Sequence, residues 1–113
     1  MANYMIAQLD ELKPVECPCG LSRRAFISKE NSAATLHIVN TKEDMQPHYH
    51  KKLTEIYLVL EGTGQIELDG KLSPVKPLTA IFIKAGCRHR ILGKMRIVNI
   101  CIPAFDREDE WFD

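Results

Sequence analysis

Four residues of types that commonly bind metals stand in two short stretches of the sequence: His48, His50 and Glu55 in the first, and His89 in the second. On an extended strand, side chains two positions apart share a face, so His48 and His50 can direct both imidazoles into one interior. Glu55 follows a polar break at residues 51–54, where a turn can return its carboxylate to the imidazoles. His89 opens another expected strand, just after a glycine turn. Residue types and spacing therefore predict one metal site built from these four side chains.

Three neutral imidazoles and one carboxylate suit a divalent transition metal: iron, manganese, nickel, copper, cobalt or zinc. Four protein ligands leave one or two positions open on a five- or six-coordinate ion, and substrate binding or catalysis requires an open position. A single histidine at a strand end is usually only a hydrogen-bonded residue. Here, however, three of the four histidines belong to the two stretches described above, which favours one bound metal ion. The sequence does not specify which metal it is. His37 lies outside the pattern and is interpreted as structural.

Short strands separated by turn residues must position these side chains. The expected strands are β-branched or alternating runs at residues 35–39, 55–60, 65–68, 80–83, 89–92 and 95–102, with a return strand from Leu72. Asp69-Gly70 predicts a tight hairpin turn, because glycine accepts the positive φ of a type I′ turn. Several short strands at close spacing indicate an all-β antiparallel sandwich or barrel. A helical turn is expected at residues 8–12.

The spacing of the first stretch resembles the first motif of the cupin superfamily. That motif places His-x-His, three or four residues, Glu, six residues and Gly. Here His48 and His50 are followed by four residues, Glu55, six residues and Gly62, which matches the motif in full. The resemblance therefore assigns all three side chains as metal ligands.

The second stretch resembles the second cupin motif, Pro-x-Gly-x-x-His, three residues and Asn, only in part. Gly86 and the metal-binding His89 match, whereas Lys84 replaces the proline and Gly93 replaces the asparagine. The resemblance extends over roughly residues 35–103. The two replacements affect the geometry of the turns around His89. All four metal-ligand positions keep the residue types of the motifs.

The resemblance implies a cupin-type antiparallel β-barrel, also called a jelly roll or double-stranded β-helix and RmlC-like, with the metal near its open end. It also implies a homodimer. The chain length suits one domain, residues 1–113, with the barrel core at about 34–103, an N-terminal arm at 1–33 and a C-terminal tail at 104–113. The acidic, aromatic tail is expected to pack on the outside of the barrel or on a second subunit.

Three other residues are candidates for contact with a substrate. If Glu55 points inward, alternation places Tyr57 on the same face, where its hydroxyl could act in catalysis; most strand tyrosines simply pack. Arg23 and Arg24 form a basic pair, and either could bind a carboxylate or phosphate group. The alternative is that both arginines are solvated surface charges.

The four cysteines, Cys17, Cys19, Cys87 and Cys101, are expected to be thiols. Cys17-Pro18-Cys19 lacks a second cysteine pair, so it is a weak zinc signal. Cys87, two residues before His89, is interpreted as a bystander. Thiols fit the expected cytoplasmic location, which follows from the lack of a secretory signal pattern in the first 16 residues.

Composition excludes several function classes. The 15 basic and 15 acidic side chains give a formal net charge of zero, which disfavours a nucleic-acid or anionic-membrane surface. No apolar run reaches membrane-spanning length. The expected partner is therefore a small-molecule ligand.

Three functions remain open at this point. The first is a metal-dependent isomerase or lyase acting on a sugar derivative or carboxylate, and the second is an iron-, nickel- or copper-dependent dioxygenase. The third is a non-catalytic binding or sensor module, suggested by the lack of an obvious general base beside the ligands.

Overall fold

The computed structural model describes residues 2–113, so of the predicted N-terminal arm only Met1 lies outside them. The described chain contains one 3-10 turn, η1 (Leu9–Glu11), and strands β1 (Val15–Cys17), β2 (Gly20–Ala25), β3 (Thr35–Thr41), β4 (Thr54–Glu61), β5 (Gly64–Leu68), β6 (Lys71–Val75), β7 (Ala80–Ile83), β8 (His89–Leu92) and β9 (Arg96–Ile102). No helix among these residues is long and apolar enough to cross a membrane.

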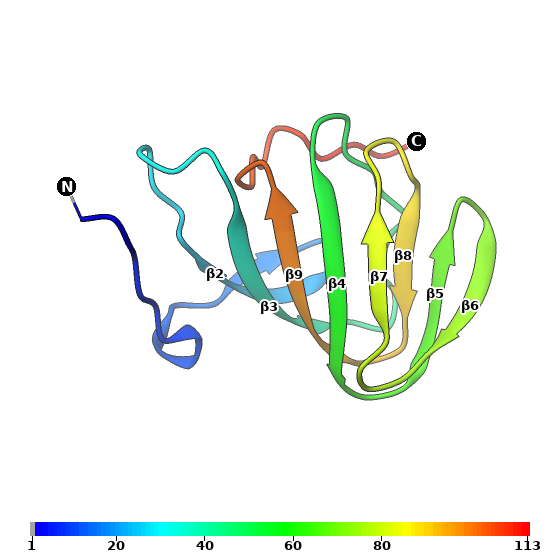
Figure 1. The fold of residues 1–113 in the computed structure, drawn as a ribbon. Coiled ribbons are helices and arrows are strands. Elements are labelled where there is room, and N and C mark those ends of the chain that lie inside the picture. The colour runs from blue at the N-terminus through cyan, green and yellow to red at the C-terminus, as the bar shows by residue number, and fades with distance from the viewer. Residues whose placement is uncertain (1) are drawn as a thin grey trace.

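The strands form two antiparallel sheets that face each other (Figure 1). The large sheet has the order β1-β2-β3-β9-β4-β7, and the small sheet has the order β6-β5-β8. Within residues 2–113 the sheets are not hydrogen-bonded into one closed cylinder. The predicted all-β antiparallel architecture is confirmed, in the form of two sheets rather than one closed barrel.

Alternation along each strand determines which side chains enter the space between the sheets. In β4 the inward positions Glu55, Tyr57 and Val59 are buried, and their neighbours are partly exposed. In β9 Ile97 and Cys101 are buried in the same way. Side chains two apart share a face of a strand, so the apolar inward positions of both sheets meet in one core. The core therefore forms because every second residue of each strand points between the sheets.

Two glycines of the predicted turns have backbone conformations that other residues rarely adopt. Asp69 and Gly70 both have positive φ, 48° and 85°, as a type I′ turn between β5 and β6 requires. Gly62 ends the first motif with φ 91°, and a Cβ atom there would lie 2.8 Å from the carbonyl oxygen of Lys94. The hairpin is confirmed, and Gly62 lets β4 turn closely past the start of β9.

The N-terminal region is more ordered than the sequence pattern indicated. The turn η1 lies where a helical turn was expected, but β1 and β2 were not predicted. Both strands extend the large sheet beyond β3.

One expectation for the cysteines was wrong, because Cys17 and Cys19 form a disulfide. The sharp reversal from β1 into β2 brings their Cα atoms to 5.2 Å, within the range that a disulfide spans. The bond leaves neither sulfur free as a thiolate ligand for zinc. Cys87 and Cys101 are thiols, as predicted.

The C-terminal tail follows β9 along the open end of the sheets (Figure 1). Tyr49 and Trp111 exchange two backbone hydrogen bonds of 3.0 and 2.9 Å, and the Lys51 ammonium lies 3.6 Å from the centre of the Trp111 ring. Arg88 donates two hydrogen bonds to the carboxylate of Asp113. The tail thus pairs with the segment that carries His48 and His50, rather than packing on the outside of the barrel.

Candidate metal centre

The three histidines lie on the side of the small sheet. His48 and His89 form an antiparallel bridge and exchange two backbone hydrogen bonds of 3.1 and 2.9 Å. Residues paired in this way point to the same face, so their rings lie close, 4.3 Å between centroids. The carbonyl oxygen of His50 accepts the N–H of Gly86, which ties the two motif segments together a second time.

Glu55 comes from the opposite sheet, and the turn at residues 51–53 returns the chain to it. The carboxylate of Asp109 in the tail accepts the N–H groups of Lys51, Lys52 and Leu53 at 2.9, 2.9 and 3.1 Å. Asp109 is 4% exposed, so this cap is shielded from water. The tail therefore fixes the turn that places Glu55 across from the imidazoles.

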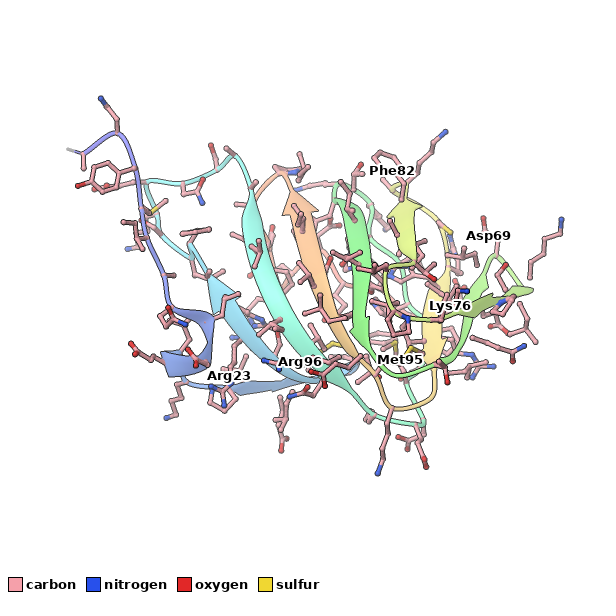
Figure 2. All side chains as sticks on the ribbon, turned by 60° about the horizontal axis from the view of Figure 1, so that its bottom comes forward. Arg23, Asp69, Lys76, Phe82, Met95 and Arg96 are labelled. Carbon is pink, nitrogen blue, oxygen red and sulfur yellow. A yellow bond between two sulfur atoms is a disulfide. The ribbon has the colours of Figure 1, made fainter. Side chains whose placement is uncertain are left out.

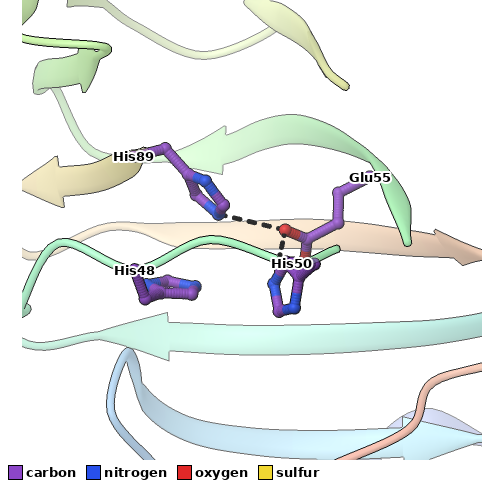
Figure 3. A group of neighbouring side chains, drawn as sticks. All are labelled: His48, His50, Glu55 and His89. Carbon is purple, nitrogen blue, oxygen red and sulfur yellow. Dashed lines mark ion pairs between the residues drawn. The ribbon is translucent and has the colours of Figure 1, made fainter. Parts of the chain in front are cut away.

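The four predicted ligands meet in one buried cluster (Figure 3). Ligand atoms from His48, His50, Glu55 and His89 all lie within 4.8 Å of one another. Glu55 Oε1 lies 3.0 Å from Nε2 of both His50 and His89, yet none of these three atoms makes a hydrogen bond of acceptable angle within residues 2–113. Buried polar atoms normally have a partner, and a metal ion between them would supply one.

Backbone carbonyls determine which nitrogen of each ring faces the centre. Nδ1 of His48 lies 3.3 Å from the carbonyl oxygen of Gln46, Nδ1 of His50 lies 2.6 Å from that of Asp109, and Nδ1 of His89 lies 2.8 Å from that of Cys87. A carbonyl oxygen only accepts, so each Nδ1 carries the proton. The lone pair of each neutral ring is then on Nε2, which is the arrangement found in metal-binding histidines.

Asn99 orients the carboxylate of Glu55. Its Nδ2 donates a hydrogen bond of 2.7 Å to Glu55 Oε2, which leaves Oε1 for the centre of the cluster. Metal-binding carboxylates are commonly held by such a neighbour. The residues present therefore fit a divalent metal in both donor set and supporting hydrogen bonds.

The pKa values show strong coupling among the ligands. Burial lowers the pKa of His48 to about 4, and the neighbouring His89 acts in the same direction. Burial also opposes the charge on His50, but the carboxylate of Glu55 outweighs it and raises that pKa to about 9. For Glu55 itself burial favours the neutral form, yet the two imidazoles hold its pKa well below the usual range. Glu55 thus remains an anion that attracts a cation.

A fifth polar group faces the centre from the tail. Glu110 Oε1 lies 3.9 Å from Nε2 of His48, and the Glu110 side chain is 20% exposed. Burial raises the pKa of this carboxyl group, and the negative charge of Glu55 adds to the effect. Glu110 therefore offers a carboxyl group beside the ligands, at a position where the sequence alone indicated no acid or base.

The three residues predicted to contact a substrate lie in different parts of the structure. Tyr57 is buried on the inner face, its ring 5.9 Å from that of His89, and burial raises its pKa well above the usual value. Arg24 points to the inner face beside His37, its partner in the β2–β3 register. Arg23 points to the outer face, where it donates to a backbone carbonyl of η1 (Figure 2). The basic pair is therefore split between the two faces of β2.

Sequence reasoning missed Asn99, Asp109 and Glu110. Asn99 alternates with Ile97 and Cys101 in an otherwise apolar strand, and an inward polar residue in such a strand was a usable signal. Nothing local marks Asp109 or Glu110, because they reach the site only through the pairing of Trp111 with Tyr49. The fourth histidine, His37, is buried and contacts Thr35 and the ring of Phe105, away from the cluster.

Comparison with known proteins gives three results. The family model of the cupin domain matches residues 35–101, more than half of the chain. No curated protein matches the sequence. Among solved structures, a protein from Planctomyces limnophilus is similar over 98% of both chains, with 38% identity and a TM-score of 0.91.

Two more distant structures share the fold. Streptomyces Pac13, a nucleoside dehydratase, has 19% identity and a TM-score of 0.84, over 96% of this chain and 90% of its own. Ectoine synthase from P. lautus has 20% identity and a TM-score of 0.77, over 96% of this chain and 88% of its own.

Proposed function

The chain belongs to the cupin family, and from this premise we propose that it is a metal-dependent enzyme acting on a small polar organic molecule, a sugar derivative or a carboxylate, in an isomerase- or lyase-type reaction. One observation carries the proposal: the Nδ1 atom of each of the three histidines faces a backbone carbonyl, so their Nε2 atoms converge with Glu55 Oε1, and Nε2 of His50, Nε2 of His89 and Glu55 Oε1 are buried without hydrogen-bond partners. A purely structural cluster of this kind would be costly to bury.

The side chains around the cluster have distinct roles in this proposal. When bound, a divalent ion would polarise a substrate oxygen. The ligands hold it from both sheets, and Asn99 keeps Glu55 Oε1 directed inward. Glu110 Oε1 is the group placed to take up or deliver a proton, since it faces the ligands from the more open tail side. The hydroxyl of Tyr57 stays protonated at neutral pH and serves as a hydrogen-bond donor.

One structural neighbour with this fold is named for a reaction without net oxidation. Pac13 is named as a nucleoside dehydratase, and a dehydratase removes water without an oxidant. Ectoine synthase shares the same fold. Identities of about 20% carry over the architecture alone. A carboxyl group beside the ligands is what proton transfer in such a reaction needs.

Metal content tests the first half of the proposal. Untagged protein is loaded with each candidate metal in turn, desalted and analysed by mass spectrometry. We expect about one ion per chain in the wild type and a strong loss in His48→Ala and His50→Ala. His37→Gln, which alters a buried histidine outside the cluster, is the matched control and keeps the metal. Equal, substoichiometric metal in all four proteins would end the proposal.

Turnover tests the second half. The loaded protein is incubated anaerobically in D2O with sugar derivatives and hydroxycarboxylates, and proton NMR detects exchange, isomerisation or elimination. Product that depends on Glu110, judged with Glu110→Gln, supports the isomerase or lyase reaction. Product that appears only with oxygen uptake supports the dioxygenase instead. A compound that raises the melting temperature and is recovered unchanged supports the non-catalytic module.

A further inference from the structure

A row of polar side chains crosses the inner face of the large sheet beside the candidate metal centre. The strand register places Arg24 opposite His37, His37 opposite Asn99, and Asn99 opposite Tyr57. Residues opposite one another on antiparallel strands share a face, so all four lie on the face that carries Glu55. The row leads from the ligand strand β4 to β2, near the edge of the sheet.

Two atoms of this row are buried without a hydrogen-bond partner among residues 2–113. They are Nε of Arg24, a donor, and Oδ1 of Asn99, an acceptor. Arg24 also makes no ion pair within the described chain. Native proteins leave few buried polar atoms unpaired, and each such atom is a candidate contact for a ligand. The row thus offers a positive end at Arg24 and a free acceptor near Glu55.

Arg24 also lines a groove of about 480 Å³ with an excess of positive charge. Lys13 and Arg107 line the groove with it, and neither makes an ion pair within residues 2–113. The one acid among the lining residues is Asp106, whose carboxylate accepts a backbone N–H of the tail. Glu110 acts on Arg24 from the metal side but forms no ion pair with it. The groove therefore has cations to offer an anion.

The apolar part of the groove holds the guanidinium in place. Val15, Ile27 and Phe105 line it, and the Arg24 guanidinium lies 4.4 Å from the centre of the Phe105 ring. The edge of His37 contacts Phe105 as well, with centroids 5.1 Å apart. Stacking on an aromatic ring restricts a guanidinium and leaves its N–H edge for a carboxylate or phosphate. The cation is thus positioned before any ligand arrives.

We propose that Arg24, with Lys13 and Arg107, binds a carboxylate or phosphate group of the substrate, whose other end reaches the metal centre. This inference rests on the proposed function and deepens it, since it assigns the substrate class of that site as anionic. Strands β4 and β2 are separated by β9 and β3, which gives about 14 Å between the backbones of Arg24 and Tyr57 and about 16 Å to Glu55, two residues along β4 from Tyr57. The side chains of Glu55 and Arg24 both extend into this span and shorten it. The substrate is therefore an extended molecule that carries its anionic group at one end and reacts at the other.

The test uses the protein without added metal, and the probes are inorganic phosphate and acetate. The backbone amide signals of β2 and the Nε–H signals of the arginines are followed by NMR during each titration. We expect a saturable shift of the Arg24 Nε–H signal in the wild type, and a dissociation constant from the backbone amide signals that is raised about tenfold in Arg24→Gln. Arg23→Gln, one residue away on the outer face, is the matched control and leaves the constant unchanged. Arg24→Lys keeps the charge without the planar fork and gives an intermediate value, which guards against a folding defect in Arg24→Gln.

The two probes and one further variant separate the possible outcomes. A stronger response to phosphate than to acetate assigns a phosphate group, and the reverse assigns a carboxylate. Binding that survives in His50→Ala and is lost in Arg24→Gln supports the groove even if metal analysis refutes the metal site. Binding lost in His50→Ala and kept in Arg24→Gln, or no saturable shift at tens of millimolar of either probe, overturns the inference and leaves the metal proposal standing.

Discussion

Replacing Asp109 with alanine tests whether the tail holds the metal-binding turn. The carboxylate accepts three backbone N–H groups, from Lys51, Lys52 and Leu53, and a fourth hydrogen bond from Nε1 of Trp111. Its own carbonyl oxygen accepts Nδ1–H of His50. The substitution therefore releases the turn between two ligands without touching either ligand.

The magnitude follows from which N–H groups regain water. Lys51 and Lys52 are exposed, so water can replace those bonds and each loss costs about 0.5–1 kcal/mol. Leu53 is 2% exposed, so water cannot replace the carboxylate as the partner of its N–H group. Losing this charged acceptor costs about 1.5–3 kcal/mol. The free energy of unfolding of Asp109→Ala is then lower by about 2.5–5 kcal/mol. Asp109→Asn keeps one acceptor oxygen, so we expect about half that loss.

Urea unfolding monitored by the fluorescence of Trp111 measures the change, and metal titration measures the effect on the site. Asp106→Ala is the control, because its exposed carboxylate accepts only the N–H of Glu108 and its loss costs about 0.5 kcal/mol. We expect weaker metal binding in Asp109→Ala only. Unfolding energies of Asp109→Ala and Asp109→Asn within the error of the wild type would refute this account of the turn.

Three further predictions concern pH and the groups around the ligands. The metal must displace the proton that His50 holds with a pKa of about 9, so we expect metal affinity to rise about tenfold per pH unit from pH 7 to 9 and then to level off. Calorimetry in buffers of different ionisation enthalpy detects the one proton released on metal binding. If no proton is released, His50 is not a metal ligand that is protonated in the metal-free protein. Asn99→Ala leaves Oε2 of Glu55 without its hydrogen-bond donor and weakens metal binding about 10- to 100-fold, whereas unchanged affinity would remove Asn99 from the site. Burial lowers the pKa of His37 to about 4, so the unfolded chain takes up the proton first as pH falls from 6.5. The wild type then loses up to about 3 kcal/mol relative to His37→Gln between pH 6.5 and 4, and parallel stability curves would contradict this.

Much of the fold could be predicted because the sheets obey a local rule. Alternating runs such as residues 65–68 and the Asp69-Gly70 turn carry the information for a hairpin within a few residues. β1 and β2 escaped prediction because their pattern is short and interrupted by Pro18, and because pairing with β3 stabilises them. The Cys17–Cys19 disulfide depends on the same reversal, which the sequence did not indicate.

The sequence by itself determined the ligand set: the two-residue spacing of His48 and His50, the return to Glu55 and the position of His89 follow from strand alternation and motif spacing. Only the tertiary structure decided what surrounds that set, because contacts between residues far apart in the chain have no local pattern. Asp109 and Glu110 reach the ligands through the pairing of Trp111 with Tyr49, across about half of the chain. The register of β2 on β3 likewise separated Arg24, which faces the inner row, from Arg23, which faces outward.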